Sequence, residues 1–190
     1  KNKSNTKSIL SNGILVCIFL GAVLAMIVLI AKPIIYYMGQ SEEVVNLAYP
    51  YITLVAISLF PLIIFQSFKQ FSDGLSFTKI AMISTVIANV INVVMNYILI
   101  YGEFGFPRLE LVGAGIGTLI SRFIMVLIII YLIKSNSKTN QYINNLFSFE
   151  YSSKIIKKIF NLGYPSALQM MFEVGFFISG IWVCGIIGIN

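Results

Sequence analysis

Five long apolar runs, separated by shorter polar segments, set the pattern of this chain. Three of them contain no charged residue: 8–31, 44–68 and 80–102. Two more, 111–133 and 162–190, are each interrupted by one charge, Arg122 and Glu173 respectively. About 20 apolar residues cross the hydrocarbon core of a bilayer as a helix, and none of these runs alternates as the strands of a membrane barrel do. The pattern therefore predicts an all-α, multi-pass membrane protein with five transmembrane helices.

Composition and the placement of charge agree with this class. Hydrophobic residues make up 58% of the chain and charged residues 11%, whereas soluble domains carry about 25% charged residues. If the N-terminus is cytoplasmic, the cytoplasmic segments hold Lys1, Lys3, Lys7, Lys69, Lys79, Lys134, Lys138, Lys154, Lys157 and Lys158. The outer segments then hold Lys32, Arg108, Glu42, Glu43, Glu103 and Glu110. This asymmetry follows the positive-inside rule, so the net charge of +6 indicates topology and we expect no nucleic-acid partner.

The longest polar connection predicts where the helices divide into bundles. Its second half is amphipathic, with one apolar and one basic face, and Ser152 or Ser153 could cap it as a helix. Such a helix would lie in the cytoplasmic headgroup region, and the alternative is a solvated linker with a basic end. We therefore predict one bundle in 1–134, a cytoplasmic connection in 135–161, and the first helix of a second bundle in 162–190.

The two ends of the chain and its cysteines exclude other classes. The basic start followed by an apolar run imitates a secretory signal, but the run is too long and four more spans follow it. The chain begins without Met and ends inside a hydrophobic run at Asn190, so we expect a fragment of a larger membrane protein. Cys17 and Cys184 both fall inside predicted spans and are expected to be small packing residues, not a disulfide or a metal site.

The run 80–102 carries four polar residues, Thr85, Asn89, Asn92 and Asn96. Their spacings of four, three and four place them on one face of a helix. Asparagine is costly against lipid, so this face must contact other helices or a water-filled cavity. Two interpretations remain open: hydrogen bonding between helices, and the polar wall of a transport cavity.

The run 111–133 combines small residues with one cation. Gly113, Gly117 and Ser121 recur at intervals of four, a pattern that lets a neighbouring helix approach closely. Arg122 follows, and could either extend toward a polar cavity or pair with a carboxylate from elsewhere in the protein.

Glu173 is the single charge of the last run, about ten residues from its start and therefore near the bilayer midplane if the helix begins at Leu162. Gln169 lies one turn before it and Ser166 seven residues before it, so polar neighbours share its face. A carboxylate at this depth usually binds a cation, a proton or a charged substrate. Glu173 and Gln169 are therefore the candidate cation or substrate site, with Na⁺ or H⁺ as coupling ion, against the alternative of a hydrogen-bonded structural glutamate.

Enzyme chemistry finds no support in the sequence. The chain has no histidine, which excludes His-based triads and His-ligated metals within it. It shows no Walker loop and no second carboxylate or nucleophile beside Glu173. We expect no enzyme, no metal centre and no cofactor other than the coupling ion.

Several segments taken together resemble a known family. They are 70–79, Gln-Phe-Ser-Asp-Gly-Leu-Ser-Phe-Thr-Lys; Asn92, Asn96 and Tyr97; 101–107, Tyr-Gly-Glu-Phe-Gly-Phe-Pro; 112–115; and 162–165 with 172–174. In this order and spacing the chain is similar to the multidrug and toxic compound extrusion (MATE) transporters, NorM-like branch.

The resemblance implies that the first four spans are helices three to six of a twelve-helix transporter and the fifth is helix seven, opening the second six-helix bundle. It implies export of small cationic or amphipathic drugs across the plasma (inner) membrane, driven by Na⁺ or H⁺ entry through alternating access. Glu173 stands where the NorM-like branch places the glutamate of its cation site, and the remaining helices of the same polypeptide would complete the cavity.

Three rival functions remain. A flippase for lipid-linked oligosaccharide or peptidoglycan precursors belongs to the same wider superfamily, but anionic headgroups would call for several cavity cations where the sequence offers Arg122 alone. A non-transporting membrane scaffold would leave Glu173 without a role, and a membrane-embedded enzyme lacks a partner for it.

Overall fold

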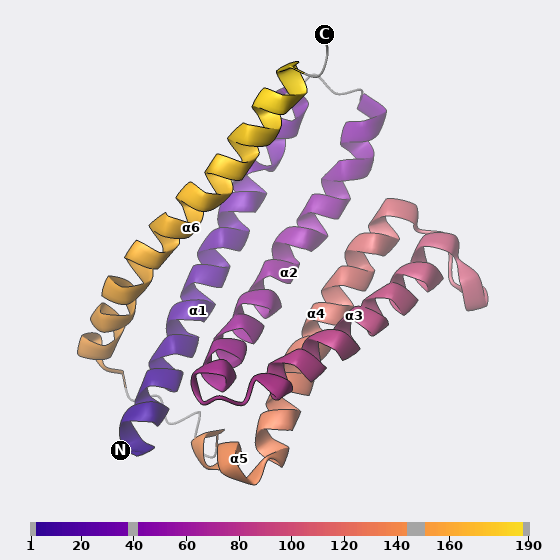
Figure 1. The fold of residues 1–190 in the computed structure, drawn as a ribbon. Coiled ribbons are helices and arrows are strands. Elements are labelled where there is room, and N and C mark those ends of the chain that lie inside the picture. Colours follow the sequence, from indigo (N-terminus) through magenta and orange to yellow (C-terminus); the bar gives the residue numbers. More distant parts are fainter. Residues whose placement is uncertain (1–2, 38–41, 144–150, 188–190) are drawn as a thin grey trace. The chain divides into compact units, whose positions relative to one another are not determined.

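A computed structural model of the chain describes residues 3–37, 42–143 and 151–187, and everything regular in them is helical. The chain divides into two units, 1–150 and 151–190. The first unit contains α1 (Lys3–Ala31), η1 (Lys32–Tyr37), α2 (Glu42–Gly74), α3 (Thr78–Tyr101), η2 (Glu103–Gly105), α4 (Glu110–Ser135) and α5 (Ser137–Ile143), and the second contains α6 (Ser153–Ile187) (Figure 1). The predicted all-α class is confirmed.

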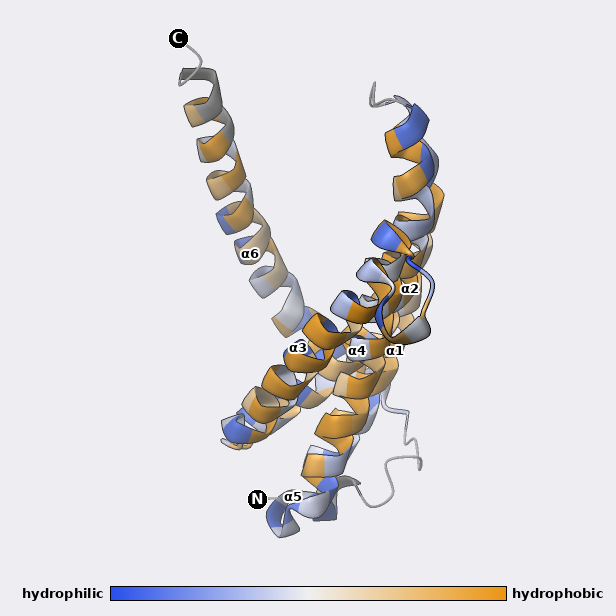
Figure 2. Ribbon diagram, turned by 90° about the vertical axis from the view of Figure 1, so that its right-hand side faces the viewer, coloured by the Kyte–Doolittle hydropathy of each residue, from blue (hydrophilic) through white to orange (hydrophobic). Residues whose placement is uncertain are grey.

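Four helical segments of the described residues are long and apolar enough to cross a bilayer: Thr6–Tyr37, Glu42–Gly74, Thr78–Tyr101 and Glu110–Ser135. Each contains one of the first four predicted spans, apart from the last residue of the span 80–102, which lies one past Tyr101. The fifth predicted span falls on α6, and its last three residues, 188–190, lie outside the described part of the chain. Figure 2 shows apolar residues along the middle of α1 to α4 and polar residues toward their ends, as a bilayer requires.

Within the first unit, α4 packs against both α2 and α3, and α1 packs on the far flank of α2 (Figure 1). The core joins apolar residues of all four long helices: Leu10, Ile14, Phe65, Phe68, Ile80, Ala88, Met125, Ile129 and Ile133. The outer faces are also apolar, since Phe19, Leu127 and Tyr131 are each about two-thirds exposed. Side chains of this kind facing outward are stable in lipid, so the hydrophobic surface agrees with a membrane location.

A sharp turn after α3 places α4 beside it. Gly102 ends α3 with φ of 77°, in the left-handed region, and its N–H donates to the carbonyl of Ile98. A Cβ added at Gly102 would lie 2.8 Å from the backbone nitrogen of Arg108, so both the conformation and the space favour glycine.

The described charges separate between the two ends of the first unit. The start of α1, the α2–α3 turn and the α4–α5 junction share one end (Figure 1). Among the described residues, this end carries one acid, Asp73, and six cations, Lys3, Lys7, Lys69, Lys79, Lys134 and Lys138. The other end carries Lys32, Arg108, Glu42, Glu43, Glu103 and Glu110. Arg108 and Glu110 form an exposed ion pair there, at 3.4 Å between Nε and Oε1. The helices thus separate the charges as the positive-inside argument assumed, and which end is cytoplasmic stays a prediction.

The predicted start of the last helix at Leu162 is wrong. The helix α6 begins at Ser153 and runs unbroken to Ile187, so the amphipathic segment and the apolar segment form one helix with Pro165 in its interior. Proline removes its own N–H bond and crowds the carbonyl four residues before it, which often kinks a membrane helix without ending it. The Lys residues before it favour helix.

The two cysteines are free. Cys17 is half-buried on α1, in agreement with a packing role, whereas Cys184 is exposed on α6. The packing role of Cys184 stays a prediction, because α6 is the single helix described in its unit.

Candidate functional site

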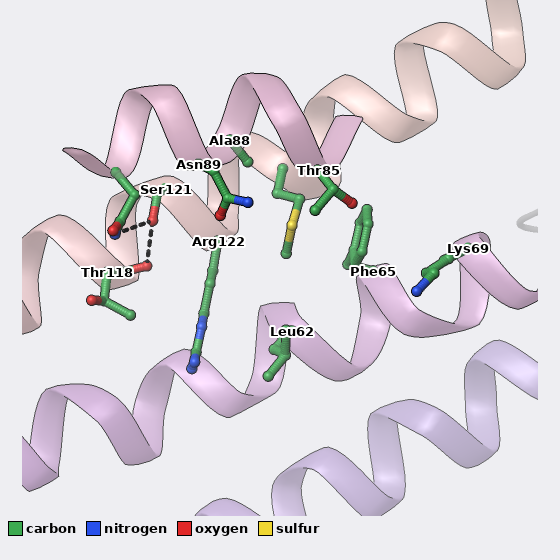
Figure 3. Close-up of a pocket in the computed structure, with 11 residues that line it drawn as sticks. Leu62, Phe65, Lys69, Thr85, Ala88, Asn89, Thr118, Ser121 and Arg122 are labelled. Atoms are coloured by element: carbon green, nitrogen blue, oxygen red, sulfur yellow. Dashed lines mark hydrogen bonds between the residues drawn. The ribbon is translucent and has the colours of Figure 1, made fainter. Parts of the chain in front are cut away.

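A polar cavity of about 360 Å³ lies between α2, α3 and α4 (Figure 3). Its lining is Leu62, Phe65, Lys69, Thr85, Ala88, Asn89, Asn92, Thr118, Ser121, Arg122 and Met125. Three of the polar residues predicted on one face of 80–102 therefore line it. The fourth, Asn96, is not part of its lining.

The asparagine face makes hydrogen bonds and also lines the cavity. Asn92 Nδ2 donates to Ser121 Oγ at 2.9 Å, which ties α3 to α4, and Asn96 Nδ2 donates to Asn92 Oδ1 at 3.1 Å. Asn89 lies one turn before Asn92 and is exposed. The amide of Asn89 and the side chain of Thr85 both line the cavity (Figure 3). On this one face of α3, Asn92 therefore bonds to the neighbouring helix, and Asn89 and Thr85 form a polar wall of the cavity.

Arg122 extends from α4 toward α2, across the cavity (Figure 3). Its Nη1 donates to Ser58 Oγ, and Ser58 is completely buried on α2. The Ser58 hydroxyl in turn donates to the carbonyl of Val55 at 2.7 Å. Arg122 therefore reaches a polar cavity, and among the described residues its hydrogen-bond partner is a neutral hydroxyl and not a carboxylate.

The charged residues in the described lining of the cavity are basic. Arg122 and Lys69 both line it, and its described lining residues include no Asp or Glu. Leu62, Phe65 and Met125 add an apolar wall. A cavity of this size with a few polar groups on an apolar wall is typical of sites for small organic molecules.

The small residues at the start of α4 bring its neighbours close, which confirms the predicted packing role of Gly113, Gly117 and Ser121. A Cβ added at Gly113 would lie 2.6 Å from the carbonyl oxygen of Leu99 on α3, and one added at Gly117 would collide with Asn96 Oδ1. Ser121 continues the same face by accepting the hydrogen bond from α3 described above.

Gly115 serves the opposite face of α4. A Cβ there would lie 2.8 Å from Leu54 Cδ1 on α2. The spacing-of-four argument missed this contact, because Gly115 lies between the two glycines of the repeat and faces another helix.

Glu173 and Gln169 lie one turn apart on α6, and both are exposed within the second unit. The Ser166 hydroxyl donates to the carbonyl of Leu162 at 3.3 Å, so its proton is used within the helix. Among the described residues, neither Ser166 nor Gln169 donates to Glu173. The candidate cation site therefore remains a prediction from the sequence.

Sequence reasoning missed a second cluster, at the opposite end of α2 from Lys69. Lys32 Nζ lies 3.2 Å from the ring centroid of Tyr49 and donates to Thr53 Oγ1. These groups line a mostly apolar cavity of about 490 Å³, together with Leu54, Val112 and Ile116 among others. A cation placed over an aromatic ring stabilises a contact between elements, here between η1 and α2.

Comparison with known proteins agrees with this architecture. Residues 1–98, slightly more than half of the chain, match the family model MatE. A solved structure described as the inward-facing conformation of a multidrug resistance MATE family transporter of the MOP superfamily is similar at a TM-score of 0.74 and 27% identity. That likeness covers 87% of this chain and 37% of the solved one.

Curated relatives carry related names. The probable multidrug resistance protein NorM of Listeria monocytogenes is 27% identical over 99% of this chain and 41% of its own length. The protein of the same name in Mannheimia succiniciproducens is 32% identical over 87% of this chain and 36% of its own. The multidrug resistance protein NorM of Vibrio cholerae is 32% identical over 76% of this chain and 32% of its own. The chain therefore spans about two-fifths or less of the length of these relatives.

Proposed function

The chain belongs to the MatE family of membrane transporters, and on that premise we propose that it forms part of a secondary active exporter of small cationic or amphipathic drugs. The polar cavity between α2, α3 and α4 is the observation that carries the proposal. It combines hydrogen-bonding groups with an apolar wall inside a unit whose outer surface suits lipid. The names of the relatives, multidrug resistance protein and probable multidrug resistance protein, support multidrug efflux as the activity of the whole protein.

In this proposal the transporter lies in the plasma (inner) membrane and exchanges the drug for Na⁺ or H⁺. Glu173, with Gln169 one turn before it, is the proposed cation site. Binding of Na⁺ or H⁺ neutralises a carboxylate in the membrane, which changes the relative free energy of the inward-open and outward-open states. Entry of one charge down a membrane potential contributes about 2.3 kcal/mol per 100 mV, enough to favour export against a drug gradient.

A flippase for lipid-linked sugars or peptidoglycan precursors is the second candidate function. The sequence offered Arg122 as the single cavity cation, and the structure places Lys69 in the same cavity. Two cations could hold an anionic headgroup, so this observation favours the flippase more than the sequence did.

Inside-out vesicles containing the complete transporter separate the two functions. We expect a fluorescent amphipathic drug analogue to accumulate when a Na⁺ or pH gradient is imposed, and to be released when an ionophore collapses that gradient. Vesicles without the protein serve as the control. Failure of any gradient to drive accumulation, combined with protein-dependent movement of a lipid-linked sugar, would contradict antiport and support the flippase.

A further inference from the structure

The cavity between α2, α3 and α4 has an unusual charge for a proposed exporter of cationic drugs. Both charged residues of its lining, Lys69 and Arg122, are basic. A cation entering this cavity would be repelled by both, since like charges in a partly desolvated space raise the free energy of binding. The chemistry of the lining is instead complementary to an anionic group.

Arg122 is the group best placed to hold such an anion. A guanidinium has five N–H donors in a rigid plane. Among the hydrogen bonds of the described residues, Arg122 uses Nη1 toward Ser58. Arg122 lines the cavity, and a planar fork of this kind matches the two oxygens of a carboxylate or phosphate.

The hydroxyl groups of the lining do not compete as donors for an anion. Thr85 Oγ1 donates to the carbonyl of Ala81 at 2.9 Å, and Thr118 Oγ1 donates to the carbonyl of Ala114 at 2.8 Å. Ser121 Oγ likewise donates to the carbonyl of Thr118 at 2.9 Å. With their protons used inside their own helices, these three hydroxyl groups are left as acceptors. The donors available to an anion are therefore charged ones, Arg122 and Lys69, with the amide of Asn89 between the helices.

The two cations stand at different ends of the cavity. Lys69 lies eleven residues along α2 from Ser58, the residue that Arg122 contacts, which is about 16 Å at 1.5 Å per residue. The apolar side chains Phe65 and Leu62 lie between these positions on the same helix (Figure 3). A ligand held at Arg122 would thus place its anionic oxygens on the guanidinium and its apolar body against this wall.

From this geometry we propose that the cavity contains an anion subsite at Arg122, which binds the carboxylate or phosphate oxygens of an amphipathic molecule. The inference rests on the proposed function insofar as the cavity receives the exported compound. Binding at Arg122 itself can be measured without transport, so the two proposals fail separately.

The test uses two dyes that differ in one group: a rhodamine with a free benzoate on its pendant ring, and the methyl ester of the same dye. Their affinities are measured by fluorescence anisotropy on the complete transporter in nanodiscs of neutral lipid, without any gradient. We expect the wild type to prefer the acid, and Arg122→Gln to lose this preference by roughly tenfold, because hydrogen bonds to charged groups are the stronger ones. The cationic ester should bind to Arg122→Gln at least as tightly as to the wild type, because one repelling charge is gone.

Two further variants separate charge from packing. Arg122→Lys keeps the cation and should retain most of the preference for the acid. Ser58→Ala removes the contact of Arg122 with α2 and leaves the cation in place, so the preference should persist. Equal binding of acid and ester to the wild type would overturn the subsite, as expected if a carboxylate of the remaining polypeptide already pairs with Arg122. An equal loss of both dyes in Arg122→Gln would overturn it too, because it would mark Arg122 as structural.

A competition arm identifies the source of the anion. Anionic phosphatidylglycerol is added to the nanodiscs, and displacement of the acid from the wild type and from Arg122→Lys but not from Arg122→Gln marks a lipid headgroup as a ligand of the same subsite. The proposed drug export is tested by gradient-driven uptake of the ester, which has no anionic group. Uptake of the ester with no acid preference would refute the subsite alone, whereas acid preference without any uptake would refute the export alone.

Discussion

The contact between Gly113 and α3 gives a prediction whose magnitude follows from the structure. In Gly113→Ala the new methyl group would lie 2.6 Å from the carbonyl oxygen of Leu99, 2.7 Å from its carbonyl carbon and 3.1 Å from the nitrogen of Ile100. Ordinary contact begins at 3.4 Å, so the closest approach is too short by about 0.8 Å. All three atoms belong to the backbone of α3, and no side-chain rotation can relieve the overlap.

The expected cost follows from two opposing effects. Overpacking a well-packed site costs about 1–3 kcal/mol, whereas Ala stabilises a helix interior by up to about 1 kcal/mol relative to Gly. We therefore expect Gly113→Ala to lower the free energy of unfolding by about 1–2 kcal/mol. The matched control is Gly74→Ala at the end of α2, where an added Cβ meets nothing within 4 Å, and its stability should be unchanged or slightly raised.

Reversible unfolding of the purified protein by a denaturing detergent in mixed micelles measures both variants on one scale. Gly113→Ala should reach its unfolding midpoint at a lower fraction of denaturing detergent than Gly74→Ala. If the two variants unfold together, α3 and α4 are not in backbone contact at Gly113 and the packing described above is wrong.

Two other features give predictions that use the same protein. Asn92→Ala, which removes the hydrogen bond to Ser121, should lower the free energy of unfolding by about 1 kcal/mol in the same titration, while Asn89→Ala on the cavity wall stays near neutral; equal costs would contradict the α3–α4 tie. In a background without Cys17 and Cys184, the variant Lys138→Cys should react with an impermeant thiol reagent added on the cytoplasmic side. The variant Glu103→Cys should react with the same reagent added on the outer side. The reverse labelling would invert the predicted topology.

The parts of the fold that follow local rules were predictable from the sequence. Each apolar run depends only on its own residues, so the four spans of the first unit were found from length and hydropathy. The small-residue face at Gly113, Gly117 and Ser121 was predictable because spacing along a helix fixes which residues share a face.

Contacts between distant segments were not predictable in this way. Arg122 and Ser58 are 64 residues apart, and Lys69 enters the same cavity only because α4 packs beside α2. The same holds for Lys32 and Tyr49, which meet through the packing of η1 on α2. A spacing rule applies within one helix and carries no information about which neighbour that helix meets.

The predicted start of the last helix at Leu162 was wrong for a different reason. Pro165 suggested a first helical turn, since proline is common there, but proline is also tolerated inside membrane helices. The residues between Ser153 and Leu162 contain nothing that ends a helix, so helix formation continues through them. Proline is found both in the first turn and in the interior of membrane helices, and the prediction assumed the first turn.

The most direct test of antiport compares Glu173→Gln with the wild type in inside-out vesicles. Glu103→Gln is the matched control, because it removes an equal charge from the exposed segment η2 at the end of the first unit. We predict that dye uptake driven by a Na⁺ or pH gradient is lost in Glu173→Gln and retained in Glu103→Gln at equal expression. Uptake by Glu173→Gln at the wild-type rate would contradict the assignment of Glu173 as the coupling site.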